Sequence, residues 1–219
     1  MILQIAGVIE SGALTAIRET LQDPTLWVDG RATAKGRARE AKSNQQAAPV
    51  EAAKTALSLI ERAILAHPVF KAAAQPARIA RLMLNRYGEG MAYGAHVDAP
   101  YIDGVRTDLS FTLFLSDPAA YEGGELIIDS AGAEDAVKPP AGTLVLYPSN
   151  FLHRVERVNR GERLAAVGWV KSLLRSAEHR AMAFELEQIG ADLAATDAPA
   201  NLRDRLQNLR NNFLRAFGD

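Results

Sequence analysis

Between residues 78 and 172 the chain is a series of short aliphatic segments separated by turn residues, and this pattern limits the fold more than any other feature. The segments lie at 79–86, 109–115, 125–128, 143–147 and 164–171. Clusters of Gly, Pro, Asp and Asn separate them, as is typical of strands joined by turns. No helical pattern lies between consecutive segments, as a parallel βαβ sheet would require. The pattern therefore predicts an antiparallel sandwich or barrel.

Residues 1–77 precede this strand-rich core and are mainly helical in pattern. We expect a short strand at 2–9 and helices at 13–21 and 52–66, where apolar side chains recur every three or four residues. Residues 27–46 differ, because they hold five basic residues and few large apolar ones, which is typical of a long surface segment. The basic part, 31–42, is either a solvated loop or a lid that meets an anionic or peptide substrate.

Residues 173–219 form a helical extension. A helix is expected at 174–189, followed by a break at 196–199. Beyond the break, Leu202, Leu206, Leu209, Phe213 and Phe217 recur at spacings of four, three, four and four. This stripe predicts a helix at 202–217 whose apolar face docks on the barrel or on another subunit, so the chain is a candidate homo-oligomer.

The counts of cysteine, histidine and charge exclude several classes of protein. The chain has no cysteine and four histidines in 219 residues, which excludes disulfide scaffolds, zinc ribbons and thiol nucleophiles. Its 25 basic and 26 acidic residues give no electrostatic reason to bind nucleic acid or anionic lipid. No apolar run approaches the ~18 residues of a membrane span. With no basic leader at the start of the chain, we expect a cytoplasmic protein.

Two of the histidines belong to a possible metal site. Residues i and i+2 of an extended segment project to one face, so His96 and Asp98 can reach one point. This pair alone is a weak signal, since a turn histidine bonded to a nearby carboxylate has the same spacing. A third ligand is available in His153, 55 residues after Asp98. Two His and one carboxylate form the facial arrangement of non-haem Fe(II).

The segment after His153 supplies a candidate anion-binding residue. Residues 159–161 read as a turn between two strands, and alternation then puts Arg163 and Trp169 on one face. A hairpin centred on residue 160 would set His153 opposite Val167. Arg163 would then lie four residues along the neighbouring strand, ~13 Å away. From there its guanidinium could grip the far end of a five-carbon dicarboxylate.

The motifs together resemble a known family. The run YGEGMAYGAHVD at 87–98, GGEL at 123–126, and His153 followed by Arg163 and Trp169 resemble the Fe(II)- and 2-oxoglutarate-dependent dioxygenases of the prolyl 4-hydroxylase type. Nearly the whole chain is similar to the bacterial PKHD-type hydroxylases, including WVDGR at 27–31, KSN at 42–44 and HPVF at 67–70. The resemblance implies an α+β, mainly β fold. Its core would be a double-stranded β-helix, or jelly roll, with flanking N-terminal helices and a C-terminal helical extension.

The resemblance also implies a site and a reaction. His96, Asp98 and His153 would bind Fe(II), and Arg163 would bind the 5-carboxylate of 2-oxoglutarate. Tyr87 and Tyr93 would line the pocket or simply pack near the barrel mouth, and Trp169 would be pocket wall or core. The implied activity is hydroxylation of an unidentified small-molecule or peptide-like substrate, with a prolyl residue as one candidate. O₂ would be consumed, L-ascorbate required, and 2-oxoglutarate converted to succinate and CO₂.

Two alternatives from other classes remain open. A jelly-roll metalloprotein could use the same three ligands for hydrolysis or isomerisation, and it would need neither O₂ nor Arg163. A non-catalytic sensor could bind iron and 2-oxoglutarate without releasing succinate. The other two histidines are interpreted as bystanders: His67 as a residue that caps or packs at a helix end, and His179 as part of a polar helix face.

Overall fold

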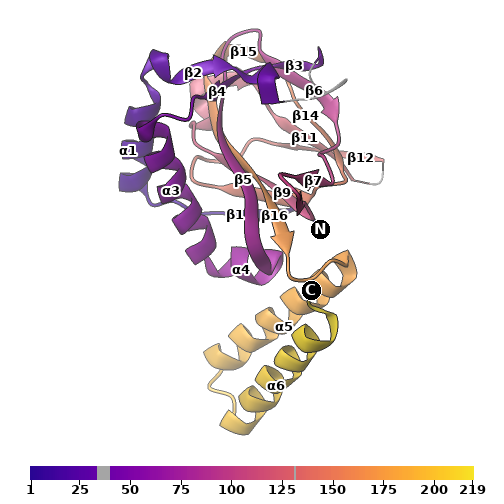
Figure 1. Cartoon of the computed structure of the whole chain (residues 1–219). Helices are drawn as coiled ribbons and strands as arrows, with labels where there is room; N and C mark the ends of the chain where they lie inside the picture. The colour runs from indigo at the N-terminus through magenta and orange to yellow at the C-terminus, as the bar shows by residue number, and fades with distance from the viewer. Residues whose placement is uncertain (34–39, 131) are drawn as a thin grey trace.

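The computed structural model describes residues 1–33, 40–130 and 132–219, and its centre is a jelly roll of antiparallel strands (Figure 1). The larger sheet has the strand order β1, β13, β9, β16, β5, β4, β2. In that order the strands span Leu3–Ile5, Leu144–Pro148, Leu109–Phe114, Arg163–Ser172, Pro76–Tyr87, Gln45–Ala47 and Trp27–Asp29. The mainly β core expected from the sequence is confirmed.

A smaller sheet completes the sandwich, with the order β12, β11, β14, β6, β3. These strands span Ala133–Val137, Leu126–Ser130, Leu152–Val155, Ala92–His96 and Lys42–Ser43. Two short ribbons close the ends: β10 with β15, and β7 with β8. Their bounds are Tyr121–Gly123, Val158–Gly161, Tyr101–Ile102 and Val105–Arg106.

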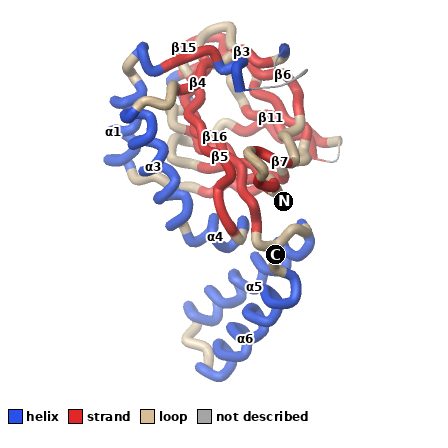
Figure 2. The backbone as a smooth tube through the Cα atoms, viewed as in Figure 1, coloured by secondary structure: helices blue, strands red, loops and turns tan. Residues whose placement is uncertain are grey.

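Helices cover the outer face of the larger sheet (Figure 2). They are α1 (Ser11–Leu21), α3 (Glu51–Ala66) and α4 (Pro68–Ala74). Their apolar stripes share one core with side chains of β16, such as Ala166 and Val170. Because side chains alternate along a strand, the neighbouring Val167 and Trp169 face the other way, into the space between the sheets. The helices thus leave the inner face of the sandwich available for a site.

The segment 27–46 is not one long surface loop, so that prediction is wrong for its described parts. It contains β2, β3 and β4, which pair with the edges of the two sheets, and the side chains of Trp27, Lys42 and Gln46 are buried. The low aliphatic content of this segment does not indicate strands, because β2, β3 and β4 contain polar residues and are held by backbone pairing with neighbouring strands. Half of the proposed lid, residues 34–39, lies outside the described residues. The strand expected at 2–9 is also shorter and covers only Leu3–Ile5.

The hairpin centred on residue 160 does not form. Strand β14 pairs with β11 and β6, where His153 lies opposite Ile128 and His96. Strand β16 belongs to the other sheet, where Val167 lies opposite Met83 and Thr112. Between them, β15 pairs with β10 instead. The chain crosses from one sheet to the other over these residues, so His153 and Arg163 are not on neighbouring strands.

Helices α5 (Ala177–Ala195) and α6 (Ala200–Phe217) form a hairpin that projects from the jelly roll (Figure 1). The stripe beginning at Leu202 does not dock on the barrel, because α6 packs beside α5. His179 is not on a purely polar face, since its ring lies 4.2 Å from that of Phe217. Across the described ranges, no helix has the length and apolar content of a membrane span.

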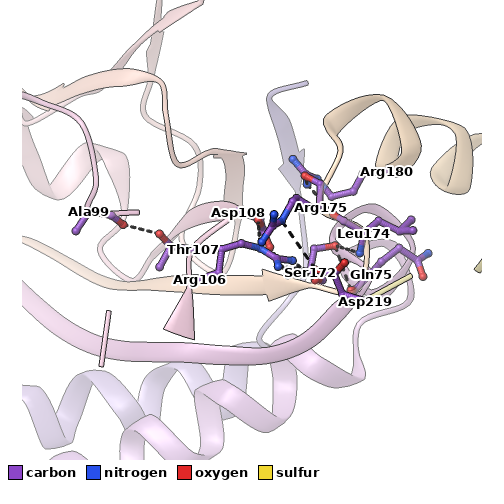
Figure 3. A network of polar contacts seen from close by, with 10 residues as sticks. All are labelled: Gln75, Ala99, Arg106, Thr107, Asp108, Ser172, Leu174, Arg175, Arg180 and Asp219. Carbon is purple, nitrogen blue, oxygen red and sulfur yellow. Dashed lines mark hydrogen bonds and ion pairs between the residues drawn. The ribbon is translucent and has the colours of Figure 1, made fainter. Parts of the chain in front are cut away.

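A polar network ties the end of the hairpin to the core (Figure 3). Arg106 of β8 donates to the Asp108 carboxylate over 2.7 Å and to the Asp219 carboxylate over 2.5 Å. The backbone N–H of Ser172, at the end of β16, donates to the other oxygen of Asp108. The last residue after α6 is therefore linked to the β7–β8 ribbon, which reaches the mouth of the central cavity.

Candidate metal centre

The three predicted metal ligands meet between adjacent strands of the smaller sheet. His96 ends β6, Asp98 follows two residues later, and His153 on β14 is the direct cross-strand partner of His96. Their candidate ligand atoms all lie within 4.8 Å of one another. The Nε2 of His153 is 3.7 Å from Oδ2 of Asp98. One metal ion can contact all three.

Hydrogen bonds orient each of these side chains. Nδ1 of His96 lies 2.9 Å from the Gly94 carbonyl oxygen, and Nδ1 of His153 lies 3.0 Å from that of Phe151. Donation from Nδ1 leaves Nε2 of each ring as a lone-pair donor to a metal. The Ser110 hydroxyl donates to Oδ2 of Asp98 over 2.6 Å, which fixes the carboxylate.

The electrostatics of the site favour a metal over a proton. Burial, together with the nearby His153, lowers the pKa of His96 to about 4, so this imidazole is neutral at pH 7. The ring of Tyr93 stacks on His96, with centroids 3.7 Å apart. Burial raises the pKa of Tyr93, so its phenol keeps its proton. Neutral imidazoles and one carboxylate are a donor set for a divalent ion.

Arg163, the first residue of β16, is a buried cation without an anionic partner. Its side chain is 1 % exposed, and none of its guanidinium nitrogens makes a hydrogen bond or ion pair within the described ranges. Aromatic rings surround it instead: the guanidinium carbon lies 5.3 Å from the Tyr87 centroid and 4.8 Å from that of Phe114. Burying an unpaired charge is costly, so this environment favours an anion.

One cavity connects the metal ligands with the neighbourhood of Arg163. It has a volume of about 370 Å³ and opens between the two sheets. His96, Asp98, His153, Tyr87 and Tyr93 all line it, and so does Trp169. Tyr87 lies directly opposite Arg163 in the strand register, so its ring joins the cavity wall to the guanidinium. Of the predicted site residues, all but Arg163 line this cavity, and Arg163 adjoins its wall through the Tyr87 ring.

Gly124 makes room for Arg163. Its φ is +68°, and an added Cβ would lie 3.2 Å from Cδ of Arg163 and 3.0 Å from the Tyr121 ring and from Val158. We expect Gly124→Ala to lower the free energy of unfolding measured in urea. Left-handed strain should contribute ~1–2 kcal/mol of this loss and overpacking ~1–3 kcal/mol.

Gly7→Ala is the matched control for that substitution. Gly7 has nearly the same φ, +69°, but nothing within 4 Å of an added Cβ, so only the strain should appear. Equal losses of stability in the two variants would show that the space around Arg163 is not tight.

Comparison with known proteins identifies the family. Residues 82–171 match the family model of the 2OG-Fe(II) oxygenase superfamily. A PKHD-type hydroxylase from Parvibaculum lavamentivorans is 42% identical over 100% of both chains. The chain belongs to the PKHD-type hydroxylases. Another member, from Picosynechococcus, is 41% identical, again over 100% of both chains. The family expected from the motifs is thus confirmed, and with it a 2OG-Fe(II) oxygenase.

Solved structures share the fold of this PKHD-type hydroxylase. A prolyl-4-hydroxylase from Pseudomonas putida superposes with a TM-score of 0.57 at 22% identity, over 78% of this chain and 92% of that one. A prolyl hydroxylase of Trichoplax adhaerens, in complex with a hypoxia inducible factor peptide fragment, gives a TM-score of 0.58 at 15% identity, over 77% and 83%. At these identities the likeness establishes the jelly roll alone.

The residues of this PKHD-type hydroxylase fit the groups that the family implies. The paired imidazoles and carboxylate of His96, His153 and Asp98 suit Fe(II). The unpaired guanidinium of Arg163 suits one end of a dicarboxylate such as 2-oxoglutarate. The Tyr87 ring lines the cavity and lies 5.3 Å from the guanidinium carbon of Arg163. Arg163 therefore adjoins the cavity wall, although it is not on a strand next to His153.

Several residues of the site were missed in the sequence. Tyr147 lines the cavity on β13, and Tyr121 lies close enough to Arg163 for the cation to oppose the rise in its pKa caused by burial. Lys42 also lines the cavity, with its amine 5.3 Å from the Tyr93 ring, and burial lowers its pKa to about 8. Alternation along 143–147 could have suggested Tyr147. Lys42 begins the KSN run that resembles the family, but no pattern in the sequence places its side chain in the cavity.

Proposed function

We propose that the chain hydroxylates a small-molecule or peptide-like substrate, coupled to oxidative decarboxylation of 2-oxoglutarate to succinate and CO₂. The observation that carries the proposal is a pair of imidazoles and a carboxylate at one cavity, beside a buried arginine that has no anionic partner among the described residues. Bound Fe(II) would supply the redox chemistry with O₂, and L-ascorbate would keep the iron reduced. The chain's own part is to bind, orient and exclude water.

Each residue has a role in this proposal. His96, Asp98 and His153 hold the metal, while the Ser110 hydroxyl keeps the carboxylate in place. Arg163 binds the 5-carboxylate of 2-oxoglutarate, which supplies the anion that the guanidinium lacks. Tyr93 covers one side of the metal position by stacking on His96.

The mouth of the cavity is the place for the substrate. Tyr101 and Ile102 of the β7–β8 ribbon line it, and Trp169 lies on its wall with a buried indole N–H that has no hydrogen-bond partner among the described residues. An indole N–H can donate to a carbonyl group, which favours an amide or peptide-like substrate. The likeness in fold to prolyl hydroxylases supports the same choice.

Anaerobic titration tests the proposal. Apoprotein is mixed with Fe(II), then with 2-oxoglutarate, and the weak visible charge-transfer band of the chelate is followed. Air is then admitted with ascorbate, and succinate is measured. We expect the band without O₂ and succinate only after air. A sensor would show the band and no succinate. A hydrolase or isomerase would show neither the band nor dependence on O₂, and either result would overturn the proposal.

A further inference from the structure

The α5–α6 hairpin has a face that the described part of the protein does not cover. None of the 18 residues of α6 is buried, and on α5 only Arg180 and Ala183 are. An amphipathic helix gains its stability by burying its apolar face. Helix α6 meets this condition only in part, through half-buried side chains that contact α5, such as Leu206 and Phe213.

The contacts within the hairpin define its two faces. Gly190 of α5 lies opposite Leu206 of α6, and Glu187 forms an ion pair with Arg210. A groove between the two helices is lined by Glu187 of α5 and Gln207 of α6, and it marks one face of the hairpin. Ile189 is two residues beyond Glu187, and Leu209 is two residues beyond Gln207. Two residues correspond to about 200° around a helix, so Ile189 and Leu209 lie on the opposite face.

That opposite face is apolar and open. Met182 is seven residues before Ile189, and Leu202 is seven before Leu209, so each pair shares one side of its helix. The exposed fractions of Met182, Ile189, Leu202 and Leu209 are 53%, 39%, 41% and 55%. These four residues are called the apolar strip below. Because the helices are antiparallel, the strip alternates between α5 and α6 along the hairpin.

The two edges of the apolar strip carry opposite charge. Asp192 and Glu185 are exposed on the outer edge of α5, and Arg205 is exposed on the outer edge of α6. With Gly190 opposite Leu206, Asp192 and Arg205 are at nearly the same height on the hairpin. A surface with an acidic edge and a basic edge at one height is complementary to a second copy of itself. The twofold axis that relates the two copies then lies between them and runs parallel to the hairpin. Asp192 of each copy then lies beside Arg205 of the partner subunit.

We propose that two copies of the chain associate through the apolar strip to form a four-helix bundle. In this arrangement α5 of one copy faces α6 of the other, and the two Asp192–Arg205 pairs flank the joined strips. A second copy is favoured over a different protein because the charge pattern is self-complementary. A twofold axis perpendicular to the helices would instead place the acidic edges of the two copies against each other, which is unfavourable.

Light scattering coupled to gel filtration tests the proposal on the full chain over a hundredfold range of concentration. We expect a particle of about twice the 23.7 kDa of one chain. Leu209→Lys should raise the dimer dissociation constant by at least ~10-fold, because it places a charge in the strip. Gln207→Lys is the matched control, two residues away on the groove face, and should leave the dimer intact. Circular dichroism verifies that each variant is folded.

A charge exchange tests the orientation of the two copies. Asp192→Arg alone and Arg205→Asp alone should each weaken the dimer, and the double variant should restore it. A wild-type chain that is monomeric throughout the range would overturn the proposal. So would a dimer that Leu209→Lys does not weaken, since the contact would then lie elsewhere. Failure of the double variant to recover would overturn the arrangement about the hairpin axis.

Discussion

Replacing Asp98 by alanine is expected to lower succinate formation from 2-oxoglutarate by more than about a hundredfold. The carboxylate is the only anionic group among the three ligands, and it offsets part of the charge of a divalent ion. Without it, His96 and His153 remain as two neutral donors, too few for a stable site. The measurement is succinate released per iron, with bound iron determined separately on the same samples.

Asp103→Ala is the control for that experiment. Asp103 also lines the cavity, but it lies at the mouth and forms an exposed ion pair with Arg81. We expect it to leave iron content unchanged. The succinate formed by Ser110→Ala should lie between the amounts formed by Asp98→Ala and Asp103→Ala. This substitution removes the hydrogen bond that orients the carboxylate but leaves the carboxylate itself in place. Full turnover in Asp98→Ala would exclude the metal site described above.

The metal ligands could be found from sequence because their spacing carries geometric information. His96 and Asp98 are two residues apart on an extended segment, which requires them to share a direction. With only four histidines in the chain, few pairs of histidines can complete a metal site with Asp98. The cross-strand pairing of His96 with His153 then completes a site that local spacing had half specified.

The strand pairing around Arg163 could not be found in the same way. The turn expected at 159–161 is wrong, because these residues belong to β15, where Arg160 and Gly161 pair with β10. Only Glu162 separates β15 from β16, and β16 takes β5 and β9 as its partners. Which strand becomes the partner is decided by packing between distant segments, and a local turn signal does not contain it.

Lys42 shows a second limit of sequence reasoning. Lysine is rarely buried, so a basic residue in a polar segment is expected in solvent. Here β3 carries Lys42 into the cavity beside Tyr93, with 5 % of the residue exposed. The backbone pairing of β3 with β6, which places it there, depends on a strand of only two residues, too short to show a pattern.

Arg163→Met is expected to weaken the binding of 2-oxoglutarate without lowering the stability of the protein. In the protein without 2-oxoglutarate the substitution removes a buried guanidinium that has no anionic partner and replaces it with an apolar side chain. Such exchanges are neutral or stabilising by about 1–4 kcal/mol, so the melting temperature should hold or rise by a few degrees. The KM for 2-oxoglutarate should rise about 30-fold or more, because the carboxylate loses its partner.

Thermal unfolding with and without 2-oxoglutarate, under anaerobic conditions with Fe(II), measures both effects. The wild-type chain should be stabilised by 2-oxoglutarate, and Arg163→Met should lose most of that increment. Arg160→Met is the matched control, because Arg160 is exposed and pairs with Glu122 on the surface. It should change neither the KM nor the increment. An Arg163→Met variant with a lower melting temperature and an unchanged KM would make Arg163 a structural residue, held by Tyr87 and Phe114 rather than poised for an anion.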